Sequence, residues 1–351
     1  MQDMRGNAMG KHFDIIEKNI YVSFYVREDG VVELEKFVPR GSGRENGIPE
    51  EEIEKRGAEE IYPLAEINVT GKSTRGMHGY RHNCSGASCD FKYKKHEINE
   101  VHDGRELVIT LQTDDDLFLY YHMRFYNEIP VVRVYSVLEN KGEESVPVEY
   151  ISSFVYQDIC GGGEKPYYDK TDVYLPYNSW VMEAQWKKED LADLNLSRLV
   201  DGYNLFGFGN NRFAYTGHSS WSSVEYLPMG MCHDRETDET YVFQVESSGQ
   251  WHIEYDTTPG RRLTLCLSGP TEQEHGWWID LKPGKTFKTV PAAFGVVKGG
   301  ISDGIGALTR YRRAMRRPNE DDIKCNIVFN DYMNCLFGDP TEEKEKPIID
   351  K

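Results

Sequence analysis

The sequence lacks the features that mark membrane-spanning, secreted or cofactor-binding chains. No apolar stretch of about 18 residues and no basic-plus-apolar leader occurs, so neither a membrane span nor a signal peptide is predicted. The seven cysteines are odd in number and scattered, which argues against a disulfide framework and favours the cytoplasm. Cys84 and Cys89, with His82 beside them, form one isolated pair, so no metal site is predicted. No cofactor is predicted either.

Positive charge is also scarce. The chain has 41 Lys and Arg against 58 Asp and Glu, which gives a formal net charge of −17. The only basic cluster comprises Arg310, Arg312, Arg313, Arg316 and Arg317, and it lies late in a predicted helix, where cations favour the C-terminal end. Nucleic-acid affinity rests on clustered Lys and Arg, so a nucleic-acid partner is excluded.

Helical periodicity is missing from most of the chain. Between residues 13 and 300 no window of about 12 residues carries an apolar stripe with a 3.6-residue period. Strand-like segments 20–26 and 31–38 flank an Asp-Gly step, and segments 117–126 and 131–140 form a second hairpin pattern. Further strands are predicted at residues 106–112, 146–156, 203–209, 240–246, 251–256, 261–269 and 286–297. So many strands at hairpin spacing predict a large antiparallel sandwich.

Two segments interrupt or end this strand pattern. Residues 40–60 are charged and glycine-rich, and an exposed excursion is predicted there. From Ser302, a cap candidate, Leu308, Tyr311 and Met315 follow a helical spacing that ends before Pro318. A single helix is therefore predicted after the sandwich.

The last residues predict the opening of a strand–loop–helix unit. The apolar run 327–329 has the character of a strand buried on both faces. Asp339-Pro340-Thr341-Glu342 then combines a cap candidate, a proline at the first helical position and an acidic residue at the third. A β/α unit is thus expected to begin shortly before the chain stops.

Five segments follow one another along the chain, at residues 148–154, 217–230, 250–256, 265–272 and 327–344. In this order they resemble the N-terminal part of glycoside hydrolase family 36, the bacterial α-galactosidase group. The similarity covers nearly the whole chain. It implies an all-β fold, a large antiparallel β-supersandwich over residues 1–300, then a linking helix over 301–318 and, over 319–351, the first strand of a truncated (β/α)8 catalytic barrel.

The resemblance also implies an activity that this chain does not contain by itself. The family is a group of retaining hydrolases of terminal α-linked galactose, with α-galactoside oligosaccharides as substrates and a homo-oligomeric assembly. Its nucleophile and its acid/base aspartate follow later barrel strands, so both are expected beyond Lys351. The isolated chain is therefore expected to be inactive, because retaining hydrolysis needs two carboxylates.

Substrate-binding candidates follow from the same resemblance. Tyr332 falls where relatives hold an aromatic residue, often tryptophan, against the galactose ring. Asp331 and Asn330 stand at the same strand end, where Asp331 either binds sugar hydroxyls or caps the loop. In the glycine-rich loop 71–89, His78 and Arg81 either reach a neighbouring active site or are merely solvated.

Other readings of the sequence stay open. One alternative is a stand-alone, non-catalytic carbohydrate-binding β-sandwich module, which would need only residues 13–300. Another is that the parent enzyme is an α-N-acetylgalactosaminidase, a specificity that barrel loops beyond this chain would set. Trp221, Trp251, Trp277 and Trp278 are predicted to pack in the sandwich core, with a carbohydrate-binding cleft as the alternative.

Overall fold

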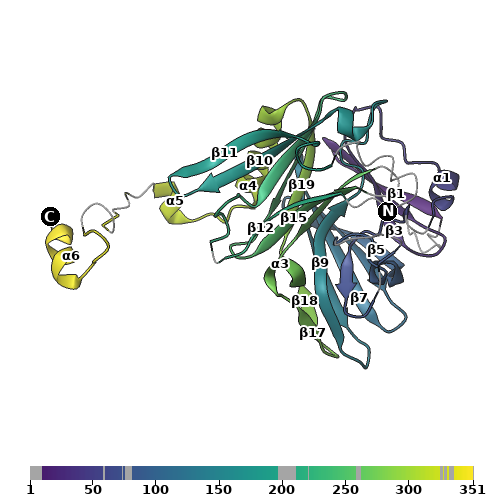
Figure 1. The fold of residues 1–351 in the computed structure, drawn as a ribbon, viewed down its shortest axis with the longest axis horizontal. Coiled ribbons are helices and arrows are strands. Elements are labelled where there is room, and N and C mark those ends of the chain that lie inside the picture. The colour runs from purple at the N-terminus through teal and green to yellow at the C-terminus, as the bar shows by residue number, and fades with distance from the viewer. Residues whose placement is uncertain are drawn as a thin grey trace. The chain divides into compact units, whose positions relative to one another are not determined.

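The computed structural model describes residues 10–57, 60–72, 74–75, 81–196, 211–219, 221–257, 262–324, 327, 330–331 and 336–350. The chain divides into two compact units, Met1–Tyr311 and Arg312–Lys351. The first unit contains the β-sheets (Figure 1). The second contains short helices.

The first unit contains three sheets, whose described strand pairs are antiparallel throughout. The three-stranded sheet is formed by β1 (Lys11–Ile16), β2 (Ile20–Val26) and β3 (Val32–Pro39). The ten-stranded sheet runs through β11 (Met182–Asp190), β10 (Thr171–Ser179), β13 (Met229–Asp234), β14 (Glu239–Val245), β19 (Ala292–Lys298), β8 (Ile129–Asn140), β7 (Leu117–Tyr126), β6 (Gly104–Gln112) and β5 (Lys92–Val101), with β18 (Thr286–Lys288) beside β8. The six-stranded sheet runs through β12 (Arg212–Gly217), β15 (Trp251–Thr257), β16 (Leu263–Ser268), β9 (Val146–Tyr156) and β17 (Ile279–Leu281), with β4 (Ile67–Val69) beside β9. The predicted large antiparallel sandwich is confirmed.

The strands follow from their alternating sequence. In β7 the side chains of Leu119, Tyr121 and Met123 are buried, while those between them are partly exposed, because a strand turns successive side chains to opposite faces. β7 pairs with β8 as the predicted hairpin, and Glu128 in the turn takes a positive φ of 61°. The predicted hairpin of β2 and β3 is also present.

Aromatic side chains join the sheets into one core. The ring of Phe294 on β19 lies 4.5 Å from Phe154, 4.9 Å from Phe37 and 5.7 Å from Tyr156, measured between centroids. These partners stand on strands of the other two sheets. All four side chains are fully buried, and burying a phenylalanine-sized side chain stabilises a fold by about 1.5–3 kcal/mol. The aromatic richness of the sequence thus serves mainly the core.

Proline divides one predicted strand into two. The segment 286–297 is continuous in the sequence pattern but forms β18 and β19, with Pro291 between them. Proline has no N–H for a ladder, so the pairing with β8 is interrupted at this point. Both pieces still pair with β8, at Lys288 with Val137 and at Ala292 with Val134.

The segment 40–60 is more than the predicted exposed excursion. It contains the short helix α1 (Glu50–Glu54), and Ile53 of this helix is fully buried. The side chain of Arg56 is only 8% exposed because it binds carboxylates of β3. The prediction of simple exposure is therefore wrong for these residues, whose contacts depend on strands distant in the sequence.

Helices are few and mostly short. Within the described residues, the α-helices besides α1 are α3 (Glu272–His275), α4 (Ile301–Met315), α5 (Glu320–Lys324) and α6 (Glu342–Ile349), and two 3-10 turns cover Ala87–Asp90 and Tyr167–Asp169. The single helix predicted after the sandwich is confirmed as α4, of 15 residues, and its role as a link to a barrel stays a prediction. None of the described helices has both the length and the apolar character that crossing a bilayer demands.

Helix α4 begins earlier than its predicted cap. Ser302 lies inside the helix, and the backbone N–H of Gly300 instead donates to the Asp303 carboxylate at 3.1 Å. Farther along, Gly304 packs against β14, where an added Cβ would lie 2.7 Å from Val242. The helix therefore approaches the ten-stranded sheet at a position that only glycine allows.

The second unit is described mainly by its helices. The predicted helix is present as α6, but it begins at Glu342 rather than Pro340, and Thr341 rather than Asp339 occupies the cap position. Of the predicted barrel strand 327–329, only Ile327 belongs to the described residues, and it lies outside any strand with 98% of its surface exposed. The structure does not show a barrel strand here.

Candidate functional site

The loop of residues 71–89 returns to the six-stranded sheet as a buried segment. Residues 82–85 expose at most 4% of their surface. The expectation of a merely solvated loop is wrong for this segment, because its polar groups find partners on the sheet. His78 lies outside the described residues.

Arg81 begins the buried segment and binds β15. Its Nη1 donates to Oδ1 of Asp256 at 3.0 Å and to the carbonyl oxygen of Thr257 at 3.2 Å. Burial raises the pKa of Asp256, and the charge of Arg81 opposes that rise. The guanidinium is engaged in this ion pair, so the role of Arg81 as a sugar ligand remains a prediction.

One buried carboxylate holds the following turn of the loop. Glu66, just before β4, accepts bonds from the N–H groups of Cys84 at 2.9 Å and Ser85 at 3.2 Å, and from the Ser88 hydroxyl at 2.6 Å. Its own N–H donates to Oγ of Ser152 on β9 at 2.9 Å. Several donors compensate the burial of this charge and fix the loop on the sheet.

Beside it lies a second cluster, the loop network, formed by His82, Arg212, His252 and Glu254. Glu254 accepts bonds from Arg212 Nε at 2.5 Å, His252 Nε2 at 3.1 Å and the backbone N–H of His82 at 3.1 Å. The ring of His82 stacks on Tyr150 at 4.1 Å and meets His252 edge-on at 4.8 Å. The network fastens the loop to β12 and β15.

The charges of the loop network are set by burial and by its cations. Burial lowers the pKa of His82 to about 3, so this imidazole is neutral near pH 7. Burial alone would raise the pKa of Glu254, but the neighbouring histidines and Arg212 hold it below its ordinary value. Glu254 is therefore a carboxylate whose charge is balanced by the guanidinium of Arg212.

The loop network does not fit a metal ion, although its residue types suggest one. One ligand atom each from His82, His252 and Glu254 lies within 4.8 Å of the others. Zinc binds such ligands at about 2.0–2.2 Å. A zinc ion here would have to share the Glu254 carboxylate with the Arg212 guanidinium, whose Nε is already bonded to that carboxylate at 2.5 Å. The three residues form a structural network rather than a metal centre.

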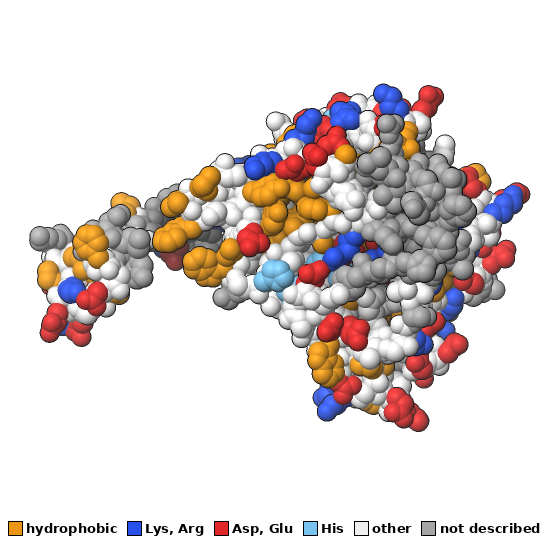
Figure 2. Space-filling model, viewed as in Figure 1, with side chains coloured by type: hydrophobic (Ala, Val, Ile, Leu, Met, Phe, Trp, Pro, Cys, Tyr) orange, Lys and Arg blue, Asp and Glu red, His pale blue; other side chains and the backbone are white. Residues whose placement is uncertain are grey.

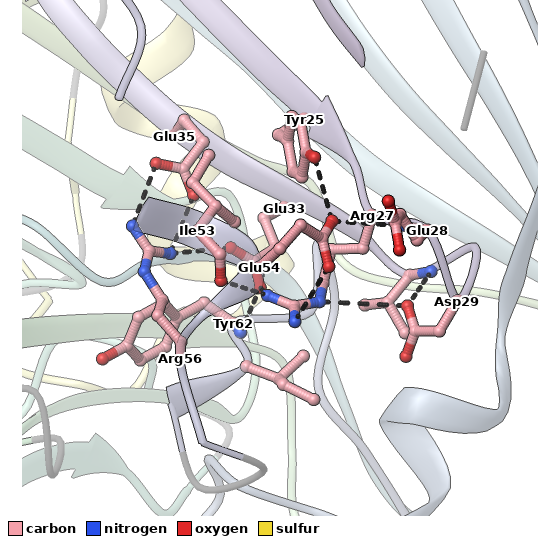
Figure 3. Close-up of polar contacts among 12 residues, drawn as sticks. Tyr25, Arg27, Glu28, Asp29, Glu33, Glu35, Ile53, Glu54, Arg56 and Tyr62 are labelled. Carbon is pink, nitrogen blue, oxygen red and sulfur yellow. Dashed lines mark hydrogen bonds and ion pairs between the residues drawn. The ribbon is translucent and has the colours of Figure 1, made fainter. Parts of the chain in front are cut away.

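A third cluster, the strand network, is formed by Arg27, Glu33, Glu35 and Arg56 (Figure 3). Glu33 and Glu35 stand two residues apart, on one face of β3. Arg56 Nη1 donates to Glu33 at 2.9 Å and to Glu35 at 3.1 Å, and Arg27 Nη1 donates to Glu33 at 3.4 Å. The backbone N–H of Tyr62 adds a bond to Glu33 at 3.1 Å.

The two carboxyl groups of the strand network take opposite protonation states. Burial, then the hydrogen bond and charge of Glu35, raise the pKa of Glu33 to about 8. Burial opposes ionisation of Glu35 too, but the bond from Glu33 and the charges of Arg56 and Arg262 lower its pKa. One proton is thus held between two carboxyl groups at neutral pH.

Such a pair has the protonation pattern of the acid and the nucleophile of a glycosidase, but a substrate cannot reach it. Glu33 and Glu35 expose 0% and 1% of their surface, and Arg56 bonds to both. A retaining glycosidase needs its carboxyl groups about 5–5.5 Å apart on either side of a sugar bond. A sugar cannot enter between these two, so the pair is structural.

The remaining predicted site residues belong to the second unit. Asn330 is exposed, and Asp331 is partly exposed and accepts a bond from the N–H of Leu336 through its backbone oxygen at 3.0 Å. Tyr332 lies outside the described residues. Their roles in sugar binding remain predictions.

Neither the strand network nor the loop network was predicted from the sequence, although the sequence contains a signal for both. Glu33 and Glu35 alternate with apolar residues in β3, and His252, Glu254 and Asp256 do so in β15. Both faces of these strands are buried. Charged residues at alternate positions of a strongly apolar strand indicate a polar face that another segment must cover.

Comparisons with known proteins place this fold. No profile of a known family and no curated protein matches the sequence. Among solved structures, the family 36 α-galactosidase AgaB of Geobacillus stearothermophilus matches with a TM-score of 0.70 and 16% identity, covering 97% of this chain and 47% of its own. The α-galactosidase of Lactobacillus brevis matches with a TM-score of 0.67 and 12% identity over 97% of this chain and 46% of its own.

A raffinose complex of an AgaA variant from Geobacillus stearothermophilus matches with a TM-score of 0.62 and 15% identity, over 88% of this chain and 45% of its own. This chain therefore spans just under half the length of these proteins. Identities this low establish the fold alone. The predicted resemblance is confirmed at that level: the chain has the sandwich fold of family 36 α-galactosidases.

Proposed function

We propose that this chain is the N-terminal region of a retaining α-galactosidase that removes terminal α-linked galactose from oligosaccharides. The observation that carries the proposal is the match of 97% of the chain to part of an α-galactosidase. Solved relatives are complexes with raffinose and with stachyose. Both sugars carry the α-galactoside linkage that the proposed enzyme would cleave.

The two catalytic carboxyl groups are assigned, in this proposal, to a barrel beyond Lys351. Retaining hydrolysis needs one carboxylate to attack the anomeric carbon and one acid to protonate the leaving oxygen. The strand network offers paired carboxyl groups, but they are buried beneath Arg56. The isolated chain is therefore expected to be inactive.

Substrate contacts are assigned to two groups of residues. His78 and Arg81 belong to the loop that the six-stranded sheet holds, and Asn330, Asp331 and Tyr332 belong to the terminal segment. Arg81 must exchange its bond to Asp256, 3.0 Å away, before it can bind a sugar hydroxyl. We therefore expect its first effect to be the positioning of the loop.

The proposal extends to assembly and location. Exposed Trp180, Val181 and Met182 form the tip of the hairpin of β10 and β11, and Figure 2 shows hydrophobic side chains gathered along this region. An apolar projection of this kind suits a subunit contact in a homo-oligomeric enzyme. The five described cysteines are free thiols, which suits the cytoplasm.

The test begins with the reading frame downstream of codon 351. A continuing frame should encode a barrel, and the full-length protein should cleave p-nitrophenyl α-galactoside while residues 1–351 alone do not. Proton NMR should then detect the α-anomer of galactose as the first product. Cleavage by the isolated chain would overturn the proposal. A stop codon with no partner gene would also overturn it and leave a sugar-binding module as the function.

A further inference from the structure

The loop after β12 forms a small open hollow. Its lining consists of Thr216, Gly217, His218, Ser219, Trp221, Val224, Glu225 and Tyr226, and its volume is about 180 Å3. Ligand pockets for drug-sized molecules are typically about 300–1,000 Å3. This hollow is smaller, so it suits a single ring rather than an oligomer.

An aromatic platform stands at the hollow. Trp221 exposes 68% of its surface, so the prediction of core packing is wrong for this residue, whereas Trp251 is fully buried as predicted. The backbone N–H of Trp221 donates to Oγ of Ser219 at 3.1 Å. The indole N–H of Trp251 donates to the carbonyl of Ser222 at 2.5 Å, which anchors the loop to the core. Hydrogen bonds therefore hold described residues of this loop on both sides of the exposed indole.

The far side of the loop is fixed to β10. The N–H of Asn178 donates to the carbonyl of Glu225 at 2.8 Å, and the rings of Tyr177 and Tyr226 lie 4.9 Å apart. Binding groups that are already ordered lose less conformational entropy when a ligand arrives. The hollow is therefore preorganised rather than formed by the ligand.

Two acceptors flank the platform. Nδ1 of His218 lies 3.1 Å from the carbonyl oxygen of Glu274, and because a carbonyl only accepts, Nδ1 carries the proton. In the tautomer with its proton on Nδ1, Nε2 is the acceptor. Glu225 is exposed, and within the described part of the chain no hydrogen bond or ion pair engages its carboxylate. None of the described residues that line the hollow is a lysine or an arginine.

We propose that this hollow binds one neutral pyranose ring. The C–H face of the sugar lies on the indole of Trp221, since an aromatic ring offers a large apolar surface beside polar groups. Sugar hydroxyls donate to the Glu225 carboxylate and to Nε2 of His218. Anionic sugars are disfavoured, because Glu225 stands at the hollow and the chain carries a net charge of −17.

This site goes beyond the proposed hydrolysis and does not depend on it. Sugar binding here involves no bond cleavage and only residues of the first unit. A chain that proves unrelated to catalysis would still bind the ring, and an active full-length enzyme could lack the site. The binding experiment and the activity experiment therefore fail separately.

Isothermal titration of the full 351-residue chain with methyl α-D-galactopyranoside tests the proposal. A single ring predicts saturable binding with a dissociation constant on the order of 1 mM. Trp221→Ala should weaken binding at least roughly tenfold, since a factor of ten corresponds to losing one aromatic contact. The matched control is Trp278→Ala, which removes another exposed indole that does not line the hollow. The control should bind like the wild type.

Four results would overturn the proposal. The first is the absence of saturable binding to the wild-type chain. The second is that both tryptophan substitutions weaken sugar binding equally, or that neither weakens it. Unchanged melting temperatures would establish that both variants fold. The third is tighter binding of methyl β-D-glucuronide than of the neutral sugar. If Trp221→Ala instead changes only the sedimentation coefficient, the hollow is a contact with a second copy, and the sugar site is excluded.

Discussion

The strand network and the loop network bury similar residues but neutralise their charge differently. In the strand network two carboxyl groups lie on one face of β3, and a proton between them removes one negative charge. In the loop network one carboxylate, Glu254, is surrounded by donors and balanced by Arg212. Proton sharing makes the first network sensitive to pH, whereas the second relies on a cation that never loses its charge.

The largest difference should appear when each network loses its arginine. Arg212→Met should lower the free energy of unfolding by roughly 3–5 kcal/mol, because it leaves the buried Glu254 carboxylate without its cation. Arg56→Met should lower the free energy of unfolding by clearly less, because Glu33 can still donate its proton to Glu35. Urea denaturation at pH 7 measures both. An equal or larger loss for Arg56→Met would show that proton sharing does not protect the strand network.

The next effect is the pH dependence of the strand network. The pKa of Glu33 is raised from 4.5 to about 8 in the folded chain, so its contribution is full below pH 4.5 and is lost as the pH rises through 8. Glu33→Gln cannot ionise and should match the wild type near pH 5. At pH 8.5 it should be more stable by roughly 2–4 kcal/mol, because one pKa unit corresponds to about 1.4 kcal/mol. Urea midpoints at both pH values measure the difference.

Glu35→Gln is the matched control for that experiment. It removes the ionised partner of Arg56, so it should destabilise the chain already at pH 6. If the two glutamine variants behaved alike across this pH range, the assignment of the proton to Glu33 would be wrong.

The smallest effect is expected at the division between the two units. Ending the chain after Pro318 removes α5 and α6 but none of the core residues of the sandwich. The melting temperature of the sandwich should change by less than about 2 °C. In a chain of this size, each kcal/mol lost from the free energy of unfolding lowers the melting temperature by only a few kelvin. Differential scanning calorimetry of both chains measures it. A clear fall would reveal that the second unit supports the first.

Strand positions were accessible from the sequence because they depend on local patterns. Alternation in β7 and the Asp-Gly turn before β3 predict hairpins that the structure contains. The division at Pro291 was also readable in principle, because proline interrupts a ladder wherever it stands. The order of strands across the sheets depends on distant pairings, and only the structure supplies it.

The site was less accessible, because burial of charge depends on segments far apart in the chain. Arg56 reaches Glu33 across 23 residues, and His82 reaches Glu254 across 172. Nothing local distinguishes such arginines and histidines from solvated ones. Of the predicted ligands, Arg81 lies in an ion pair, Asn330 is exposed and Asp331 is partly exposed, while His78 and Tyr332 lie outside the described residues. The sugar-binding role of all five remains a prediction.

The outer strand of the ten-stranded sheet bears on how the chain behaves at high concentration. Among the described strands β11 pairs only with β10, so no described strand covers its other edge. Glu183, Lys187, Lys188 and Glu189 stand along this strand. A foreign strand could lengthen the sheet only by desolvating these charges. We expect these charges to oppose fibrillar aggregation, and concentrated salt, which screens them, should weaken that opposition.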